Sequence, residues 1–234
     1  MRRFFGRKDG NNMIIEGDEF NHLKNVLRLG VGQEVMISIN DENEYVCEIT
    51  EIAKKQAVCK INGVHKCLLN PKKNIVLFQA MAKKDTFEAV VQKATEIGIS
   101  RIVPFMTKFC VAKPTENKIE RLQVIAQNAC NQCERTIVPV IEKAINVDEM
   151  IERFKDFDIV LLANERTDNG EKPKEIVKAK NIAIIVGSEG GFDPKEKDKM
   201  IAAGAVSISL GKRILRVETA SVSMMSLISI LSGN

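Results

Sequence analysis

LGKRILRVETASVSMMSLISIL, residues 210–231, changes from a glycine-containing turn into a helical pattern halfway along its length. The helical half places four apolar side chains on one stripe: Met224, Leu227, Ile228 and Leu231. The turn carries Arg213 and Arg216 in an otherwise apolar stretch, and Glu218 follows closely. Because removing an unpaired charge from water is unfavourable, these charges either lie at the surface or meet an anionic partner.

Upstream of this stretch, from residue 74 onward, apolar runs alternate with helical patterns. The expected strands cover residues 74–82, 101–107, 158–165, 181–189 and 206–211. The expected helices cover residues 85–98, 116–135, 193–205 and 218–231. Asp193 with Pro194 is typical of a helix start, and Asp85 and Glu88 have the spacing of a capping box. The alternation predicts an α/β fold with a mostly parallel sheet that is covered on both faces.

Residues up to about 70 have a different pattern, dominated by short strands. Three strands are expected at residues 34–39, 44–49 and 57–61, preceded by a short helix within 17–32. This pattern predicts a small β-barrel or sandwich with one helix. Residues 68–74, LLNPKKN, are typical of a linker. We therefore expect two domains, covering residues 1–70 and 74–234.

Composition limits the class of protein. The 234 residues are 44% hydrophobic and 28% charged, with a formal net charge of +4. No apolar run approaches the roughly 20 residues that cross a membrane, and the N-terminus lacks the apolar segment of a secretory signal. We therefore expect a cytoplasmic protein with no membrane partner. The six cysteines include one close pair, Cys130 and Cys133, without a second pair at zinc-ligand spacing, so we assign no metal.

Cations gather at the N-terminus, where Arg2, Arg3, Arg7 and Lys8 surround two phenylalanines. Phosphate attraction with base stacking on Phe4 and Phe5 would suit a nucleic acid, while a solvated terminal segment is the alternative.

Two loops fall where ligands bind in an open α/β sheet, outside the carboxyl ends of the strands. They are VGSEGGFDP at residues 186–194 and KRILRVETA at residues 212–220. Neither a dinucleotide fingerprint nor a P-loop is present, and a carboxylate at Glu189 disfavours a phosphate cradle. The alternatives are a simple chain reversal in the first loop and an exposed Arg216–Glu218 pair in the second.

VGSEGGF followed by LGKRILRVETA resembles the C-terminal signature of the SPOUT methyltransferases. Within that superfamily the chain is similar to the ribosomal RNA small subunit methyltransferase E family. Four other segments agree in order: RRFF at 2–5, HLKNVLRLGVGQEV at 22–35, QKATEIGISRIVPF at 92–105 and AQNACNQCERTIVPVI at 126–141. One departure is Ser188, which stands where the family usually has proline.

The resemblance implies a PUA-like β-barrel over residues 1–70 that holds RNA. It further implies a SPOUT α/β domain with a deep trefoil knot over residues 74–234, and a homodimer. The implied reaction is methylation of N3 of a uridine in 16S ribosomal RNA, on the free RNA or the small ribosomal subunit, with S-adenosylmethionine as methyl donor.

The resemblance also implies roles for individual residues. Cofactor binding is expected from Leu162, Gly187, Glu189, Gly190, Gly191, Leu210, Gly211, Ile214 and Leu215. RNA binding is expected from Arg2, Arg3, Arg7, Lys24, Arg28, Arg135 and Arg213. Arg216 would stabilise negative charge on the uracil oxygens, and Glu218 would act as general base or orient Arg216. Because N3 lies on the Watson–Crick edge, the target uridine must be unpaired or flipped out.

Two other functions are weighed against this one. A non-catalytic RNA-binding factor in ribosome assembly could share the fold with a degenerate cofactor pocket. An enzyme with a nicotinamide cofactor would need the dinucleotide fingerprint, which the sequence lacks. Only the methyltransferase accounts for both loops together with the basic N-terminus.

Overall fold

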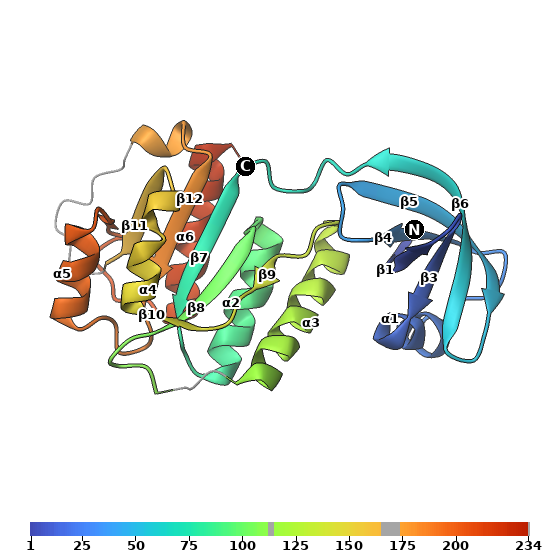
Figure 1. Cartoon of the computed structure of the whole chain (residues 1–234), viewed down its shortest axis with the longest axis horizontal. Helices are drawn as coiled ribbons and strands as arrows, with labels where there is room; N and C mark the ends of the chain where they lie inside the picture. The colour runs from blue at the N-terminus through green and yellow to red at the C-terminus, as the bar shows by residue number, and fades with distance from the viewer. Residues whose placement is uncertain (112–114, 165–173, 234) are drawn as a thin grey trace. The chain divides into compact units, whose positions relative to one another are not determined.

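The computed structural model describes residues 1–111, 115–164 and 174–233, and these form two compact units (Figure 1). The first unit contains Met1–Asn70 and Cys130–Val138, and the second contains Pro71–Ala129 and Pro139–Asn234. The segment 130–138 therefore lies in the first unit, although the sequence places it within the domain at 74–234.

The first unit is a six-stranded sheet with the strand order β1-β4-β5-β6-β3-β2. Its strands are β1 Arg2–Phe5, β2 Arg7–Asp9, β3 Asn12–Glu16, β4 Glu34–Ser38, β5 Asn43–Ile52 and β6 Gln56–Lys66. β1 pairs with β4 in parallel, and the other pairs are antiparallel. The expected helix within 17–32 is shorter, consisting of α1 Gly17–Asn21 and the π-helix η1 His22–Val26.

Gly6 explains how this sheet curls. β1 and β2 occupy opposite edges of the sheet, yet only Gly6 separates them in the chain. The two edges must therefore approach each other at this residue. Its amide donates to the Ser38 carbonyl at 2.9 Å, and a Cβ at this position would lie 2.6 Å from the Ile14 carbonyl oxygen. Only glycine allows so close an approach of two backbone segments.

The segment 130–138 is held to the first unit by side-chain hydrogen bonds to its backbone. The Asn70 Oδ1 accepts from the amides of Thr136 and Ile137, each at 3.2 Å. The Thr136 hydroxyl donates to the Asp41 carbonyl at 2.6 Å, and the Asn40 Oδ1 accepts from the Val138 amide at 2.8 Å. Such bonds between residues distant in sequence leave no local pattern, so the sequence gives no signal for this boundary.

The second unit is an α/β domain, as the alternation of the sequence predicts. Its strands are β7 Asn74–Ala80, β8 Arg101–Met106, β9 Val140–Ile141, β10 Ile145–Asn146, β11 Ile159–Ala163, β12 Asn181–Val186 and β13 Val206–Ile208. The order is β10-β8-β7-β12-β11-β13, with β9 also on β8, and every pair among the described residues is parallel. Glu165, the last residue of the expected strand 158–165, lies outside the described residues.

Helices cover both faces of this sheet (Figure 1). They are α2 Lys84–Ile97, α3 Glu116–Cys133, α4 Val147–Glu152, α5 Pro194–Ala202 and α6 Val217–Ser232, with short 3-10 turns η2 Phe154–Asp156 and η3 Lys174–Val177. Met150 of α4 and Met200 of α5 pack with alternate strand residues, such as Phe78 and Phe105, into one core. α2 and α6 pack against each other, and α6 packs on β12. In the part of the chain that the structure describes, no helix is long and apolar enough to cross a membrane.

One of the two expected helix starts is confirmed and the other is wrong. Asp193 caps α5, with its Oδ1 accepting from the Lys195 amide at 2.9 Å and its own amide donating to Glu196 at 3.2 Å. α2 instead begins one residue before Asp85, and Glu88 binds Arg121 through two contacts of 2.7 and 3.1 Å. Glu88 therefore forms an ion pair with α3 in place of the hydrogen bond that a capping box at the start of α2 would need.

Replacing Gly6 by alanine should lower the free energy of unfolding by about 1–3 kcal/mol, because the added methyl group clashes with backbone. Chemical denaturation monitored by circular dichroism measures this. Gly30→Ala is the matched control, since a Cβ there would meet no heavy atom within 4 Å. Equal effects of the two substitutions would contradict the role given to Gly6.

Candidate functional site

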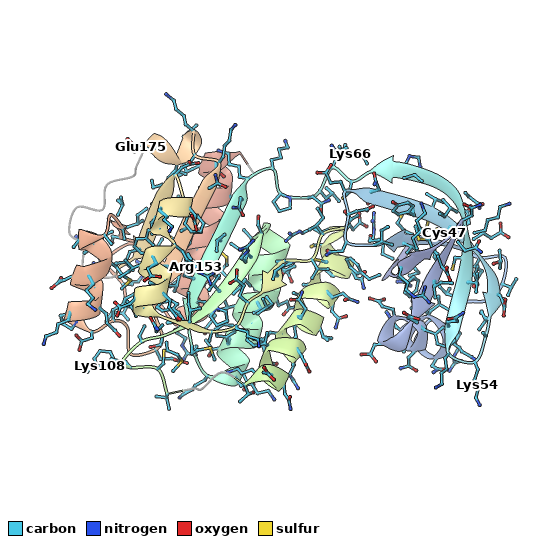
Figure 2. The ribbon with its side chains drawn as sticks, viewed as in Figure 1. Cys47, Lys54, Lys66, Lys108, Arg153 and Glu175 are labelled. Carbon is cyan, nitrogen blue, oxygen red and sulfur yellow. The ribbon has the colours of Figure 1, made fainter. Side chains whose placement is uncertain are left out.

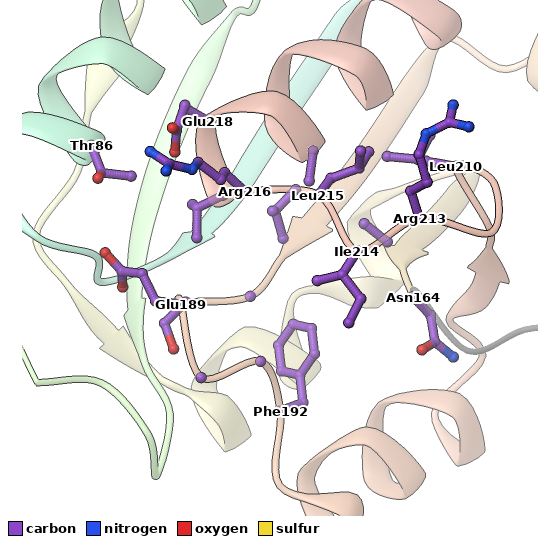
Figure 3. Close-up of a pocket in the computed structure, with 18 of the residues that line it drawn as sticks. Thr86, Asn164, Glu189, Phe192, Leu210, Arg213, Ile214, Leu215, Arg216 and Glu218 are labelled. Carbon is purple, nitrogen blue, oxygen red and sulfur yellow. The ribbon is translucent and has the colours of Figure 1, made fainter.

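A pocket of about 950 Å³ lies at the carboxyl edge of the parallel sheet in the second unit (Figure 3). Residues that follow β7, β11, β12 and β13 all line it. The largest contributions come from the loop at 186–192 and from the stretch at 210–218. The two loops that the sequence singles out therefore face one common cavity.

Most of the residues expected to bind a cofactor line this pocket. They are Gly187, Glu189, Gly190, Gly191, Leu210, Gly211, Ile214 and Leu215. Leu162 does not line it, because its side chain is fully buried in the core between the sheet and α4. The pocket wall after β11 is instead formed by Ala163 and Asn164, the next two residues along the chain.

The first loop is a tight turn that depends on glycine. The Gly191 amide donates to the Ser188 carbonyl at 2.9 Å, and Gly191 has a positive φ of 68°. A Cβ on Gly190 would lie 2.8 Å from the Cβ of Phe109, and one on Gly187 would lie 3.1 Å from the Phe192 ring. Glycine at these positions therefore allows the loop to pack closely against Phe109 and Phe192.

The Glu189 carboxylate has a backbone partner. Its Oε1 accepts from the Lys83 amide at 3.0 Å, and Lys83 is the residue that precedes α2. Figure 3 shows this side chain extending to the side of the pocket where Thr86 lies. Glu189 therefore links the first loop to the start of α2, a connection that the sequence does not reveal.

Ser188 in the first loop is buried, with 6% of its surface exposed. Its hydroxyl oxygen has no hydrogen-bond partner among the described residues. A buried hydroxyl without a partner loses its hydration and gains nothing in exchange, which lowers stability.

The second loop presents both apolar and charged groups. Gly211 has a positive φ of 111°, and the loop then carries Ile214, which is 79% exposed. In Figure 3 the Ile214 side chain points towards Phe192 of the first loop, and Arg213 extends away from Arg216. The side chains of the two arginines therefore lie on different sides of the pocket.

Arg216 and Glu218 both project from the start of α6 (Figure 3). The Arg216 carbonyl accepts from the Ala220 amide at 2.8 Å, so the backbone of this residue is fixed by the helix. Within the described ranges neither side chain forms a hydrogen bond or ion pair, so the alternative Arg216–Glu218 pair is not formed. Both groups line the pocket and are available to a ligand.

Several residues expected to bind RNA occupy different environments in the first unit. Arg2, Lys24 and Arg28 are exposed, and half of the Arg7 side chain is exposed beside Glu16. The Arg3 guanidinium is 16% exposed and binds Glu44 at 2.6 Å and Glu134 at 3.3 Å. The Arg3 side chain is therefore paired with carboxylates of the first unit.

Arg135 and the two N-terminal phenylalanines are interior residues. Arg135 is 4% exposed, and burial lowers the pKa of its guanidinium. Phe4 is 0% exposed and Phe5 is 8% exposed, so neither offers a surface for base stacking. The expectation that these three side chains contact RNA is therefore corrected by their burial.

A second hollow of about 570 Å³ lies on the first unit, between α1–η1 and the turn joining β5 to β6. Lys24, Lys54 and Lys55 line it, and the Lys24 Nζ lies 5.3 Å from the centre of the Phe20 ring. Figure 2 shows Lys54 projecting outward from the tip of this turn. Lys54 and Lys55 are not among the residues predicted to bind RNA, although two adjacent lysines in a hairpin turn are a visible sequence signal of a basic surface.

All six cysteines are free thiols, and four of them are buried. Burial raises the pKa of the Cys47 and Cys130 thiols to about 12. Among the residues that the structure describes, no group of three or more potential ligands gathers in a way that could hold a metal ion.

Residues in both units match known domain families. Residues 69–229 match the RNA methyltransferase domain, and residues 15–62 match the RNA methyltransferase PUA domain. The ribosomal RNA small subunit methyltransferase E of Mesomycoplasma hyopneumoniae is 33% identical over 97% of this chain and 98% of its own. The Bacillus subtilis protein of the same name is 30% identical, over 92% of this chain and 88% of its own.

Two solved structures are similar to this chain over nearly its whole length. A protein from Legionella pneumophila, solved in complex with its bound cofactor SAM, has a TM-score of 0.90 and 26% identity, covering 97% of this chain and 96% of its own. The ribosomal RNA small subunit methyltransferase E of Neisseria gonorrhoeae, solved with S-adenosyl methionine, shares the fold. Its TM-score is 0.88 at 24% identity, over 99% of this chain and 98% of its own.

Ser188→Ala should raise the free energy of unfolding by about 1 kcal/mol, because it removes a buried hydroxyl that lacks a partner. Ser221→Ala is the matched control. The Ser221 hydroxyl is equally buried but bonded to Gln79 at 2.7 Å, so its loss should destabilise the protein. Denaturant titration of the two variants measures both effects, and a loss of stability in Ser188→Ala would contradict the assignment.

Proposed function

This chain belongs to the ribosomal RNA small subunit methyltransferase E family, and we propose that it methylates N3 of a uridine in 16S ribosomal RNA. The observation that carries the proposal is the single pocket at the carboxyl edge of the sheet. Two glycine loops line it, and at the start of α6 it presents one guanidinium and one carboxylate that bind no other described residue.

S-adenosylmethionine fits the chemistry of this pocket. Leu210, Ile214 and Leu215 supply apolar surface for an adenine ring, and the glycines allow the backbone to approach a ligand closely. The cofactor carries a sulfonium and a carboxylate but no phosphate, which agrees with a loop that lacks a phosphate motif. When bound, it supplies an electrophilic methyl group.

The reacting atom of the RNA must lose a proton. Uracil N3 becomes a good nucleophile as its proton leaves, and negative charge then spreads onto the two flanking carbonyl oxygens. We assign to Arg216 the stabilisation of that charge, because its guanidinium lines the pocket and has no internal partner. Glu218, the second residue of α6, either accepts the N3 proton or orients Arg216.

We propose that exposed cationic side chains make the contacts with RNA. These are Arg2, Arg7, Lys24, Arg28, Lys54 and Lys55 on the first unit and Arg213 beside the pocket. Arg3 and Arg135 are left out because they are buried or paired internally. Cations of this kind neutralise phosphates and hold the substrate strand, while base recognition falls to the pocket.

Three further features are part of the proposal. The end of the α/β domain threads through itself as a deep trefoil knot, as the resemblance implies. A second copy of the chain covers the outer side of α6, where Ile230 is 79% exposed among serines. The substrate, 16S ribosomal RNA or the small subunit, places the activity in the cytoplasm.

Arg216→Ala should reduce the rate of methyl transfer at saturating substrate by about 100-fold, because a donor to the developing charge is lost. Its dissociation constant for S-adenosylmethionine, measured by calorimetry, should change less than about threefold. Arg213→Ala is the matched control, a second exposed arginine of the same loop that faces away from Arg216 and should keep its rate at saturating RNA.

The same calorimetric measurement distinguishes the methyltransferase from the alternative function, a non-catalytic assembly factor. A non-catalytic assembly factor on this fold would release no heat with S-adenosylmethionine while still binding the RNA. Unchanged turnover in Arg216→Ala would remove this residue from the mechanism.

A further inference from the structure

Gln79 is a polar residue inside the most buried strand of the second unit. It lies near the end of β7 and is 0% exposed, with Val186 of β12 beside it in the parallel register. A polar side chain in an otherwise apolar strand is unfavourable unless its hydrogen bonds are complete. Neither Gln79 nor its partner Ser221 lines the pocket.

Both the nitrogen and the oxygen of the Gln79 side-chain amide form hydrogen bonds. Its Nε2 donates to the Ala80 carbonyl and to the Gly187 carbonyl, each at 3.1 Å, and lies 3.5 Å from the Val186 carbonyl. Its Oε1 accepts from the Ser221 hydroxyl of α6 at 2.7 Å, and that hydroxyl also lies 2.8 Å from the Val217 carbonyl. The reverse orientation of the amide would set its oxygen against carbonyl oxygens, so the network fixes one orientation.

This amide joins three segments that the proposed reaction requires. Gly187 opens the first pocket loop, and Ser221 lies one turn after Val217, the residue that follows Arg216. The end of β7 leads to Lys83, whose amide holds Glu189 of the first loop. The Gln79 amide therefore links α6 to the first loop through hydrogen bonds.

We propose that Gln79 and Ser221 are positioning residues for the methyl-transfer site, holding the first loop at a fixed place relative to the start of α6. The proposal rests on the proposed function, since it assigns these two loops to S-adenosylmethionine and the uridine. A fully satisfied buried network gives a unique geometry as well as stability, and an apolar pair would keep the packing but lose that geometry.

The test uses Ser221→Ala and Gln79→Met in the full chain. Thr95→Val is the matched control, because Thr95 is also 0% exposed and its hydroxyl donates to the carbonyl four residues earlier at 2.8 Å, within α2. Hydrogen–deuterium exchange without ligand is measured for the amides of 187–191 and 210–216. Calorimetry then gives the dissociation constant for S-adenosylmethionine.

Ser221→Ala and Gln79→Met should speed amide exchange in both loops and weaken S-adenosylmethionine binding by about tenfold, since hydrogen bonds that fix the site are lost. Thr95→Val should lower the unfolding temperature without either effect. Exchange rates and affinity equal to wild type in both variants would overturn the proposal. Because exchange is measured without ligand, loosened loops in a protein that never binds S-adenosylmethionine would support the positioning role and reject the proposed function.

Discussion

β7 and β12 pair in parallel from Asn74 beside Asn181 to Gln79 beside Val186. Because parallel strands end at the same edge of a sheet, this register brings the loops after both strands together. β11 and β13 extend the sheet beside β12, and their following segments join the same edge. The pocket is a consequence of this pairing: a shift of one residue between β7 and β12 would turn the Gln79 amide away from the Gly187 carbonyl.

Several charged side chains of the described residues form ion pairs, whereas Arg216 and Glu218 at the pocket form none. Arg3 binds Glu44, Arg121 binds Glu88 and Lys108 binds Asp193. The hydrogen bond from Lys108 lowers the pKa of Asp193, so the capped start of α5 is most stable above the ordinary pKa of aspartate and weakens as the pH falls through the lowered value. Arg216 and Glu218 instead face a pocket of about 950 Å³, where an unpaired guanidinium can act on substrate.

Much of the fold follows from local pattern, and the remainder depends on contacts between distant residues. The strand–helix alternation and the Asp193 cap are visible because period and capping are local. The short strands β1 to β3 show little periodicity, and β1 and β3 pair with distant strands, β4 and β6. The burial of Arg135, the link from Glu189 to Lys83 and the buried Gln79 amide have no counterpart in the sequence pattern, although a glutamine within an apolar strand is a usable signal.

We propose that a guanidinium at the start of α6 stabilises negative charge on a uracil that has lost its N3 proton. The position of the methyl group tests this proposal, because loss of the N3 proton places negative charge on both flanking carbonyl oxygens, whereas methylation of a ribose oxygen does not. Small-subunit RNA lacking the modification is incubated with the protein and S-adenosylmethionine, and its nucleosides are separated by mass spectrometry. We expect 3-methyluridine, whereas a methyl group on a ribose oxygen or a base carbon would show that N3 is not the nucleophile.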